Sequence, residues 1–141
     1  MNKTKSNIGS RILAGVIDYG IIYTFFFVLI FTLGEPDVEG IYHLKGLSAI
    51  IPITFWFALT VGLEFGMGGT IGNSLMGLKV ISIKENNRNI TFTQSLKRHL
   101  LDPIDMFFFG LVGAITIEYT ERNQRVGDLW AKTIVVRKNK I

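Results

Sequence analysis

The sequence predicts an all-α integral membrane protein: two spanning helices, a third apolar segment that spans or re-enters the membrane, and a small cytoplasmic β-pair. Apolar residues make up 48% of the 141-residue chain and charged residues only 18%, a low charged fraction for a soluble domain. The run from Arg11 to Leu33 is apolar almost throughout, and a helix of this length crosses the roughly 30 Å hydrocarbon core at about 1.5 Å per residue. It is too long for the core of a cleaved signal peptide, so we interpret it as an uncleaved anchor.

Two charges mark the first spanning helix. Arg11 begins it, and Asp18 follows two turns later on the same face. Because roughly 10 Å separates them along the axis, each needs a partner elsewhere. A carboxylate inside a spanning helix costs about 2.5–3.5 kcal/mol on insertion scales, so we expect Asp18 to face a polar group or a water-filled cavity. Two plainer interpretations stay open: Arg11 as a cation that reaches the membrane interface, and Asp18 as a polar contact between helices.

The second spanning helix is predicted over residues 47–65, after an acidic loop over 34–46. The positive-inside rule places the basic N-terminus in the cytoplasm and this loop outside. We expect a kink at Pro52. In an antiparallel hairpin Glu64 comes to about the depth of Arg11, which predicts an ion pair between the two.

A cytoplasmic segment with three predicted parts follows the second helix. The glycine-rich stretch 66–77 lacks the G-x-x-x-x-G-K-[ST] spacing of a phosphate loop, which favours a tight turn. Residues 78–85 alternate as in a strand, and 86–89 predict a turn. Residues 90–101 predict a basic amphipathic helix, capped by a threonine, that lies along the inner leaflet.

The third apolar segment, over about 102–118, is only just long enough to span and is interrupted by proline and glycines. If it spans, the tail over 119–141 lies outside, yet six of the 15 basic residues lie in that tail. The positive-inside rule therefore favours a broken or re-entrant segment, with a full span as the alternative. The strand-like run 133–137 has residues 78–85 as its natural partner, and two strands cannot pair across a bilayer.

One internal similarity links two distant segments. Residues 11–18 and 98–105 share Arg, Leu, Ile and Asp at matching positions, with equal spacing from Arg to Asp. A duplication would place two acids at similar depth, as in transporters built from repeats. Because leucine and isoleucine are common in this chain, chance similarity is the alternative.

Three motifs in order resemble those of the RDD family of small integral membrane proteins. They are R-x-x-A-x-x-I-D over 11–18, G-x-T-x-G-x-x-L-x-G-L-K-V over 68–80, and R-N-Q-R-V-G-D-L-W-A-K-T-I-V-V over 122–136. The family takes its name from an arginine at the start of the first membrane helix and two aspartates, the first inside that helix. The resemblance implies one domain over the whole chain, 1–141.

The resemblance assigns the family's residues as follows. The arginine is Arg11, the first aspartate is Asp18, and the second is Asp128, with Asp105 as the alternative. Where the family often has proline and lysine in its glycine-rich turn, this chain has Ile71 and Asn73, which argues against anion binding there.

Two classes of function follow from the residues. In the first, the protein is a transporter or cation/proton exchanger, in which Asp18, assisted by Asp105 or Glu64, alternates between a proton and a small cation. Two or three helices enclose little space, so this hypothesis requires a homo-oligomer. In the second, the charged residues only pin helices and tail together in a structural or partner-binding membrane module. The candidate polar residues for either class are Arg11, Asp18, Glu64, Arg98, Asp105 and Asp128.

Asp128 has three candidate structural roles. It can cap the turn that it begins, or pair with Arg98 or with Arg11 at the cytoplasmic surface.

Other classes of function are not expected. The chain has no cysteine and no cofactor motif, and no nucleophile lies beside a base, so neither an enzyme nor a bound cofactor is predicted. Basic residues flank apolar segments, as in a protein oriented in a bilayer, so nucleic acid is not an expected partner. We expect a multi-pass protein of the plasma membrane with a cytoplasmic N-terminus.

Overall fold

Two long apolar helices dominate the computed structural model, which describes residues 7–84 and 89–138. The first is α1, Ile8–Leu33. The second runs from Gly46 to Met67 through a 3₁₀ turn η1 (Gly46–Ala49), α2 (Ile50–Phe57), a π-turn η2 (Ala58–Gly62) and α3 (Leu63–Met67). Both are long and apolar enough to cross a membrane, and only 6% and 11% of their most apolar windows is buried inside the protein. Such outward-facing apolar surface is unlike the core helix of a soluble domain.

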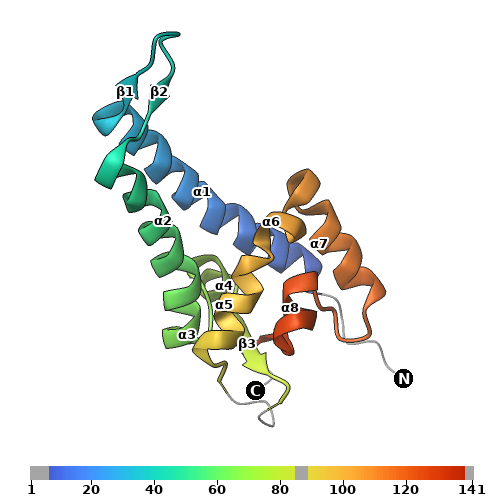
Figure 1. The fold of residues 1–141 in the computed structure, drawn as a ribbon. Helices are drawn as coiled ribbons and strands as arrows, with labels where there is room; N and C mark the ends of the chain where they lie inside the picture. Colours follow the sequence, from blue (N-terminus) through green and yellow to red (C-terminus); the bar gives the residue numbers. More distant parts are fainter. Residues whose placement is uncertain (1–6, 85–88, 139–141) are drawn as a thin grey trace.

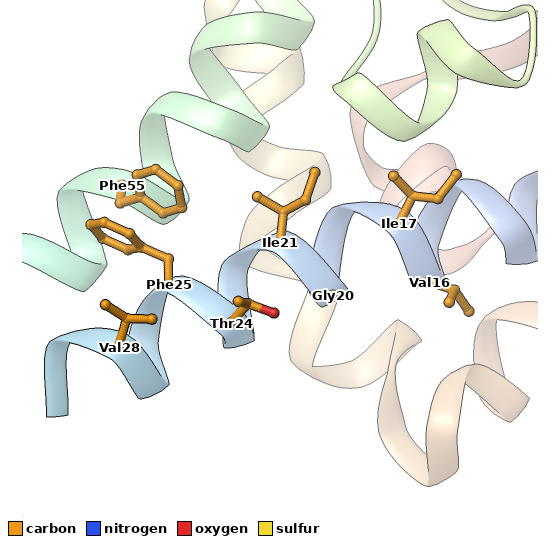
Figure 2. A pocket seen from close by; sticks show the side chains of 8 residues that line it. All are labelled: Val16, Ile17, Gly20, Ile21, Thr24, Phe25, Val28 and Phe55. Carbon is orange, nitrogen blue, oxygen red and sulfur yellow. The ribbon is translucent and has the colours of Figure 1, made fainter. Parts of the chain in front are cut away.

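The two long helices pack through aromatic rings midway along their length. Phe25 of α1 stacks on Phe55 of α2 with ring centroids 3.7 Å apart. A shallow groove beside this contact is lined by Val16, Ile17, Gly20, Ile21, Thr24, Phe25, Val28 and Phe55 (Figure 2). The lining of this groove is uncharged, and Arg11 and Asp18 of α1 line a different cavity.

Small corrections apply to the predicted loop and kink. A short hairpin of β1 (Glu35–Pro36) and β2 (Tyr42–His43) joins the long helices. Pro52 lies in the first turn of α2, where its missing N–H leaves no helical bond unmade. The irregular turn of this helix is η2 instead.

The predicted β-pair is confirmed. Strand β3 (Leu78–Ser82) pairs antiparallel with β4 (Thr133–Arg137), and Val80 lies opposite Val135. The strand ends at Ser82 rather than at Glu85, because Ile83 and Lys84 form a turn. Of the turn predicted over 86–89, residues 86–88 lie outside the described residues, and Asn89 forms a β-bridge with Ile81. The glycine-rich stretch is more than a turn, because it contains a short helix α4 (Ile71–Leu75) capped by the Thr70 side chain. Strands and α1 share a small core of Ala14, Leu78, Val80, Ile90 and Val135.

The predicted amphipathic helix is α5 (Phe92–Leu100), and its threonine cap is confirmed: Thr91 and Gln94 form a capping box. Its expected position on a membrane surface is wrong in one respect. Arg98 and His99 are buried, with 2% and 5% of their surface exposed. Because these side chains find acidic partners inside the protein, the basic face of α5 points inward.

The third apolar segment is broken into two helices, α6 (Asp102–Asp105) and α7 (Phe107–Tyr119). In Figure 1, α5 and α6 rise together and α7 returns beside them to the level of α8 (Val126–Ala131). The β1–β2 hairpin lies at one end of the molecule, and β3, the partner of β4, lies at the other. Arg137 Nε of β4 donates to Asn7 Oδ1, just before α1, at 3.0 Å.

Candidate functional site

Charged side chains from five helices and the segments beside them meet around one cavity of about 570 Å³. We call the ionisable residues of this region the charged cluster: Arg11, Asp18, Glu64, Arg98, His99, Asp102, Asp105, Arg125 and Asp128. Opposite them the cavity is apolar, with α7 supplying Leu111, Ala114 and Ile117. All six candidate residues from the sequence lie in this cluster, although they are far apart along the chain.

Asp128 joins the two arginines that the sequence offered as alternative partners. Its carboxylate is fully buried, accepts from Arg11 Nη2 at 2.5 Å and pairs with Arg98 Nη1. It also accepts from the Arg125 backbone N–H at 3.1 Å, so the predicted capping role is present too. Burial alone would raise the pKa of Asp128, but the guanidinium groups of Arg98 and Arg11 outweigh it and hold that pKa well below its ordinary value. Asp128 is thus ionised at neutral pH and links α1, α5 and α8.

Arg11 points into the protein rather than toward a membrane interface. Its side chain is only 8% exposed, and Nη1 donates to the Asn123 carbonyl at 2.5 Å. The interpretation of Arg11 as a cation that reaches the headgroups is therefore wrong for this structure.

Glu64 pairs with Arg98, so the predicted pair with Arg11 is wrong. Glu64 Oε1 lies 3.0 Å from Arg98 Nε and accepts from Ser95 Oγ at 3.0 Å. Ser95 Oγ also contacts the Val61 carbonyl, within the π-turn, at 3.2 Å. Depth along a helical hairpin predicts that two residues lie at a similar level, but it does not predict that they touch. At this level α5 lies between Glu64 and Asp128, and Arg98 bridges the two acids.

His99 lies between two acids. Its Nδ1 is 2.7 Å from Asp102 Oδ2, and its Nε2 is 3.4 Å from Glu64 Oε2. Asp102 Oδ2 also accepts from the Tyr19 hydroxyl at 2.8 Å. Burial alone would lower the pKa of His99, but Glu64 and Asp102 outweigh it, so that pKa is raised above its ordinary value.

Arg125 is the third guanidinium of the cluster. Its Nη1 lies 3.0 Å from Asp102 Oδ1, and its Nε lies 3.6 Å from Asp105 Oδ2. Burial would lower the pKa of Arg125, yet Asp102, Asp128 and Asp105 together raise it above its ordinary value. Arg125 is therefore charged at neutral pH.

Sequence reasoning missed His99, Asp102, Arg125 and Tyr19 as site residues. Two signals were available. His99 and Asp102 are three residues apart, as are Arg125 and Asp128, and each pair is in ionic contact.

Asp18 differs from the other acids because only neutral groups hold it. Oδ2 accepts from Thr70 Oγ1 at 2.6 Å, and Oδ1 accepts from the Gly72 backbone N–H at 2.7 Å. Within residues 7–84 and 89–138 it makes no ion pair. As predicted, it does not pair with Arg11. Asp18 lines the cavity, and its hydrogen bonds to Thr70 and Gly72 hold α1 against α4.

Asp105 is held in a similar way at α8. Its two oxygens accept from the backbone N–H groups of Val126 and Gly127 at 2.9 and 3.0 Å.

The charged cluster carries more acid than base. Five carboxylates oppose three guanidinium groups, so with all five ionised the net charge is negative whether His99 is neutral or protonated. Some buried polar atoms have contacts but no well-aligned hydrogen bond: Glu64 Oε2, Arg98 Nε, His99 Nε2, Asp102 Oδ1 and Arg125 Nε. Among the described residues, no group of three or more histidine, aspartate or glutamate side chains has the arrangement of a metal site. The region is thus suited to protons or to a weakly held cation, and its charge disfavours an anion.

Comparison with known families finds one match. Residues 5–132 match the family model described as the RDD family, which covers nearly the whole chain. No curated protein and no solved structure matches.

Proposed function

The chain belongs to the RDD family, and from that premise we propose that this membrane protein exchanges a small cation for protons at the charged cluster. The observation that carries the proposal is the state of Asp18. It lines the cavity, it lies in an apolar helix, and among the described residues no guanidinium or imidazole forms an ion pair with it. A carboxylate in such a position exchanges its partners, because a proton and a cation compete for the same oxygens.

The ion pairs around Asp18 have a different role in this proposal. Arg98 pairs with Glu64 and Asp128, and Arg11 pairs with Asp128, so these two acids and two bases compensate one another. They tie α1, α3, α5 and α8 around the cavity and leave Asp18 as the acid that can change partner. No cofactor and no enzymatic step enters this proposal.

The membrane arrangement belongs to the proposal as well. We place the protein in the plasma membrane as a multi-pass homo-oligomer, with the N-terminus and the β3–β4 pair in the cytoplasm and α6–α7 as a re-entrant pair. The sparse burial of both long helices supports contact with lipid or with further copies. Neither nucleic acid nor a bound metal is part of it.

Flux measurements test the exchange. Purified protein in vesicles is challenged with Na⁺, K⁺ or Li⁺ gradients while internal pH is followed. Wild type is expected to move protons against the cation, and Asp18→Asn to lose this flux, because an amide keeps the contacts to Thr70 and Gly72 but cannot titrate. Glu39→Gln removes an exposed carboxylate from the hairpin loop and should keep full flux.

A structural or partner-binding module is the second candidate. The dense ion pairing of Asp128, Glu64 and Arg98 favours it, since buried pairs of this kind also serve only to hold helices. Folded wild type without flux under all three gradients would favour this candidate.

A further inference from the structure

The two segments that resemble each other in sequence occupy equivalent places in the fold. Arg11 and Asp18 lie on α1 with the same spacing as Arg98 and Asp105, which lie on the consecutive helices α5 and α6. Both arginines contact the same residue, Asp128, Arg98 from within the same part of the chain, 98–137, and Arg11 from the part before it. This contact joins the two segments.

Each aspartate holds a short helix through a glycine. Asp18 accepts from Gly72 N–H at the start of α4, and Asp105 accepts from Gly127 N–H at the start of α8. A Cβ atom on Gly72 would lie 2.8 Å from Asp18 Oδ2, and one on Gly127 would lie 3.0 Å from Asp105 Oδ2. Both glycines also press against a backbone carbonyl of the helix that carries the arginine. The same docking thus occurs twice.

Both short helices lead into a strand in the same way. Gly77 after α4 and Lys132 after α8 have positive φ, 65° and 56°, and each is followed directly by β3 or β4. Val80 and Val135 are each eight residues beyond their glycine, and they lie opposite each other in the sheet. Antiparallel strands that pair at equivalent residues are related by a twofold axis through that pair.

The helices follow the same symmetry in Figure 1. The helix α1 rises and α2–α3 returns on one side, whereas α5–α6 rises in the crossing direction and α7 returns on the other side. The second hairpin is shorter, since α7 has 13 residues and the helix from Gly46 to Met67 has 22. The broken third segment is then a shortened copy of the first two helices.

We propose that residues 11–82 and 98–137 are two copies of one unit, and that Asp105 is a second exchange carboxylate, the counterpart of Asp18. The assignment rests on the proposed exchange of cations for protons. Both acids line one cavity, which also contains the buried oxygens Glu64 Oε2 and Asp102 Oδ1 that lack hydrogen bonds.

The contacts distinguish Asp105 from the remaining acids. Glu64, Asp102 and Asp128 each lie within 3.0 Å of a guanidinium nitrogen. The nearest guanidinium contact of Asp105 is 3.6 Å, to Arg125 Nε, and its hydrogen bonds come from neutral backbone groups. In the exchange step, the O–H bond of each protonated carboxyl breaks, its proton leaves to water, and the carboxylate oxygens take up the cation.

Proton release on cation addition tests this assignment without transport. NaCl is added to purified protein in weakly buffered detergent, with choline chloride as the control, and a pH dye records released protons. Wild type is expected to release more protons than Asp18→Asn or Asp105→Asn, and the double variant none. Glu39→Gln should release as many as wild type. Full proton release and full vesicle flux from Asp105→Asn would overturn the assignment of Asp105 and leave the proposed exchange intact. A wild type with neither proton release nor flux would overturn both the assignment and the proposed exchange.

A measurement on wild type alone covers the case in which Asp105→Asn does not fold. A hydrophobic carbodiimide modifies protonated carboxyl groups, and peptide mass mapping locates the products. Modification of both Asp18 and Asp105, each suppressed by NaCl but not by choline chloride, is expected. Na⁺-protected modification of Asp18 without Asp105 would contradict the second site.

Discussion

At the scale of single residues, His99 couples the stability of the cluster to pH. It contacts Glu64 and Asp102 from the inside of α5. Those two acids in turn contact Arg98, Arg125 and Tyr19, and Asp18 lies close enough to interact electrostatically with His99. A protonated imidazole between two carboxylates is stabilised by both. Its folded pKa is therefore above the ordinary value of 6.5.

The sign of the pH effect follows from that shift. A raised folded pKa contributes stability fully below the unfolded pKa and loses it as pH rises through the folded pKa. We predict that the thermal unfolding midpoint in detergent falls as pH rises above the ordinary histidine value, and that His99→Gln removes this dependence. His43→Gln, at the exposed hairpin, should keep it. An unchanged pH profile in His99→Gln would show that the imidazole is neutral in the folded state.

The sequence identified the members of the cluster better than their partners. Arg11, Asp18, Glu64 and Asp128 stand out because charges in or beside apolar runs are costly. Depth alone, however, suggested Arg11 for Glu64. The actual partner, Arg98, is on a helix whose basic composition resembles that of a surface helix. Which face of a short amphipathic helix points inward depends on acids supplied by other elements, and no local pattern contains them.

At the scale of elements, two short helices are docked by glycines. Helices α4 and α8 have five and six residues, too few to be stable alone in water. Close approach to α1 and α5 lets the Asp18 and Asp105 carboxylates accept the first free N–H groups. Glycine is required at Gly72 and Gly127 because a side chain would separate these surfaces.

We predict that Gly72→Ala and Gly127→Ala both destabilise the protein, Gly72→Ala by the larger amount. A Cβ atom at Gly127 would lie 2.6 Å from the Arg98 carbonyl oxygen, and one at Gly72 would lie closer still to the Ala14 carbonyl oxygen. Overpacking of this kind costs typically about 1–3 kcal/mol, measured as a lowered unfolding midpoint in detergent. Gly9→Ala, where no atom lies within 4 Å, should be neutral or stabilising by up to about 1 kcal/mol. Wild-type unfolding midpoints in both Gly72→Ala and Gly127→Ala would contradict the proposed role of these glycines in docking α4 and α8.

Element prediction from sequence succeeded where a local rule decides and failed where packing decides. The apolar runs, the Thr91 cap and the β3–β4 pair follow from length, capping and alternation. The α4 helix was missed, because its glycines favour a turn until contact with Asp18 stabilises the helix. At the third segment the distribution of basic residues favoured a broken or re-entrant segment over a full span, and the structure has a break between α6 and α7.

At the scale of the whole molecule, the two proposed units, residues 11–82 and 98–137, differ in the length of their helices. The α1 helix and its partner are long enough to cross a bilayer, whereas α7, with 13 residues, covers about 20 Å. The shorter half can therefore enter a membrane and return without crossing it. This geometry brings β4 back to β3, and it keeps the basic tail on the side of the start of α1, as the positive-inside rule requires.

The position of the loop after α7 is the last prediction. The chain has no cysteine, so single cysteines report their own side of the membrane. With a membrane-impermeant maleimide on intact cells, we expect Glu39→Cys in the exposed hairpin loop to react, and the exposed Arg122→Cys after α7 to react only after permeabilisation. Reaction of both in intact cells would mean that α7 crosses the membrane. Since β3 and β4 could not then pair within one copy, that outcome would also contradict the twofold arrangement of the two halves.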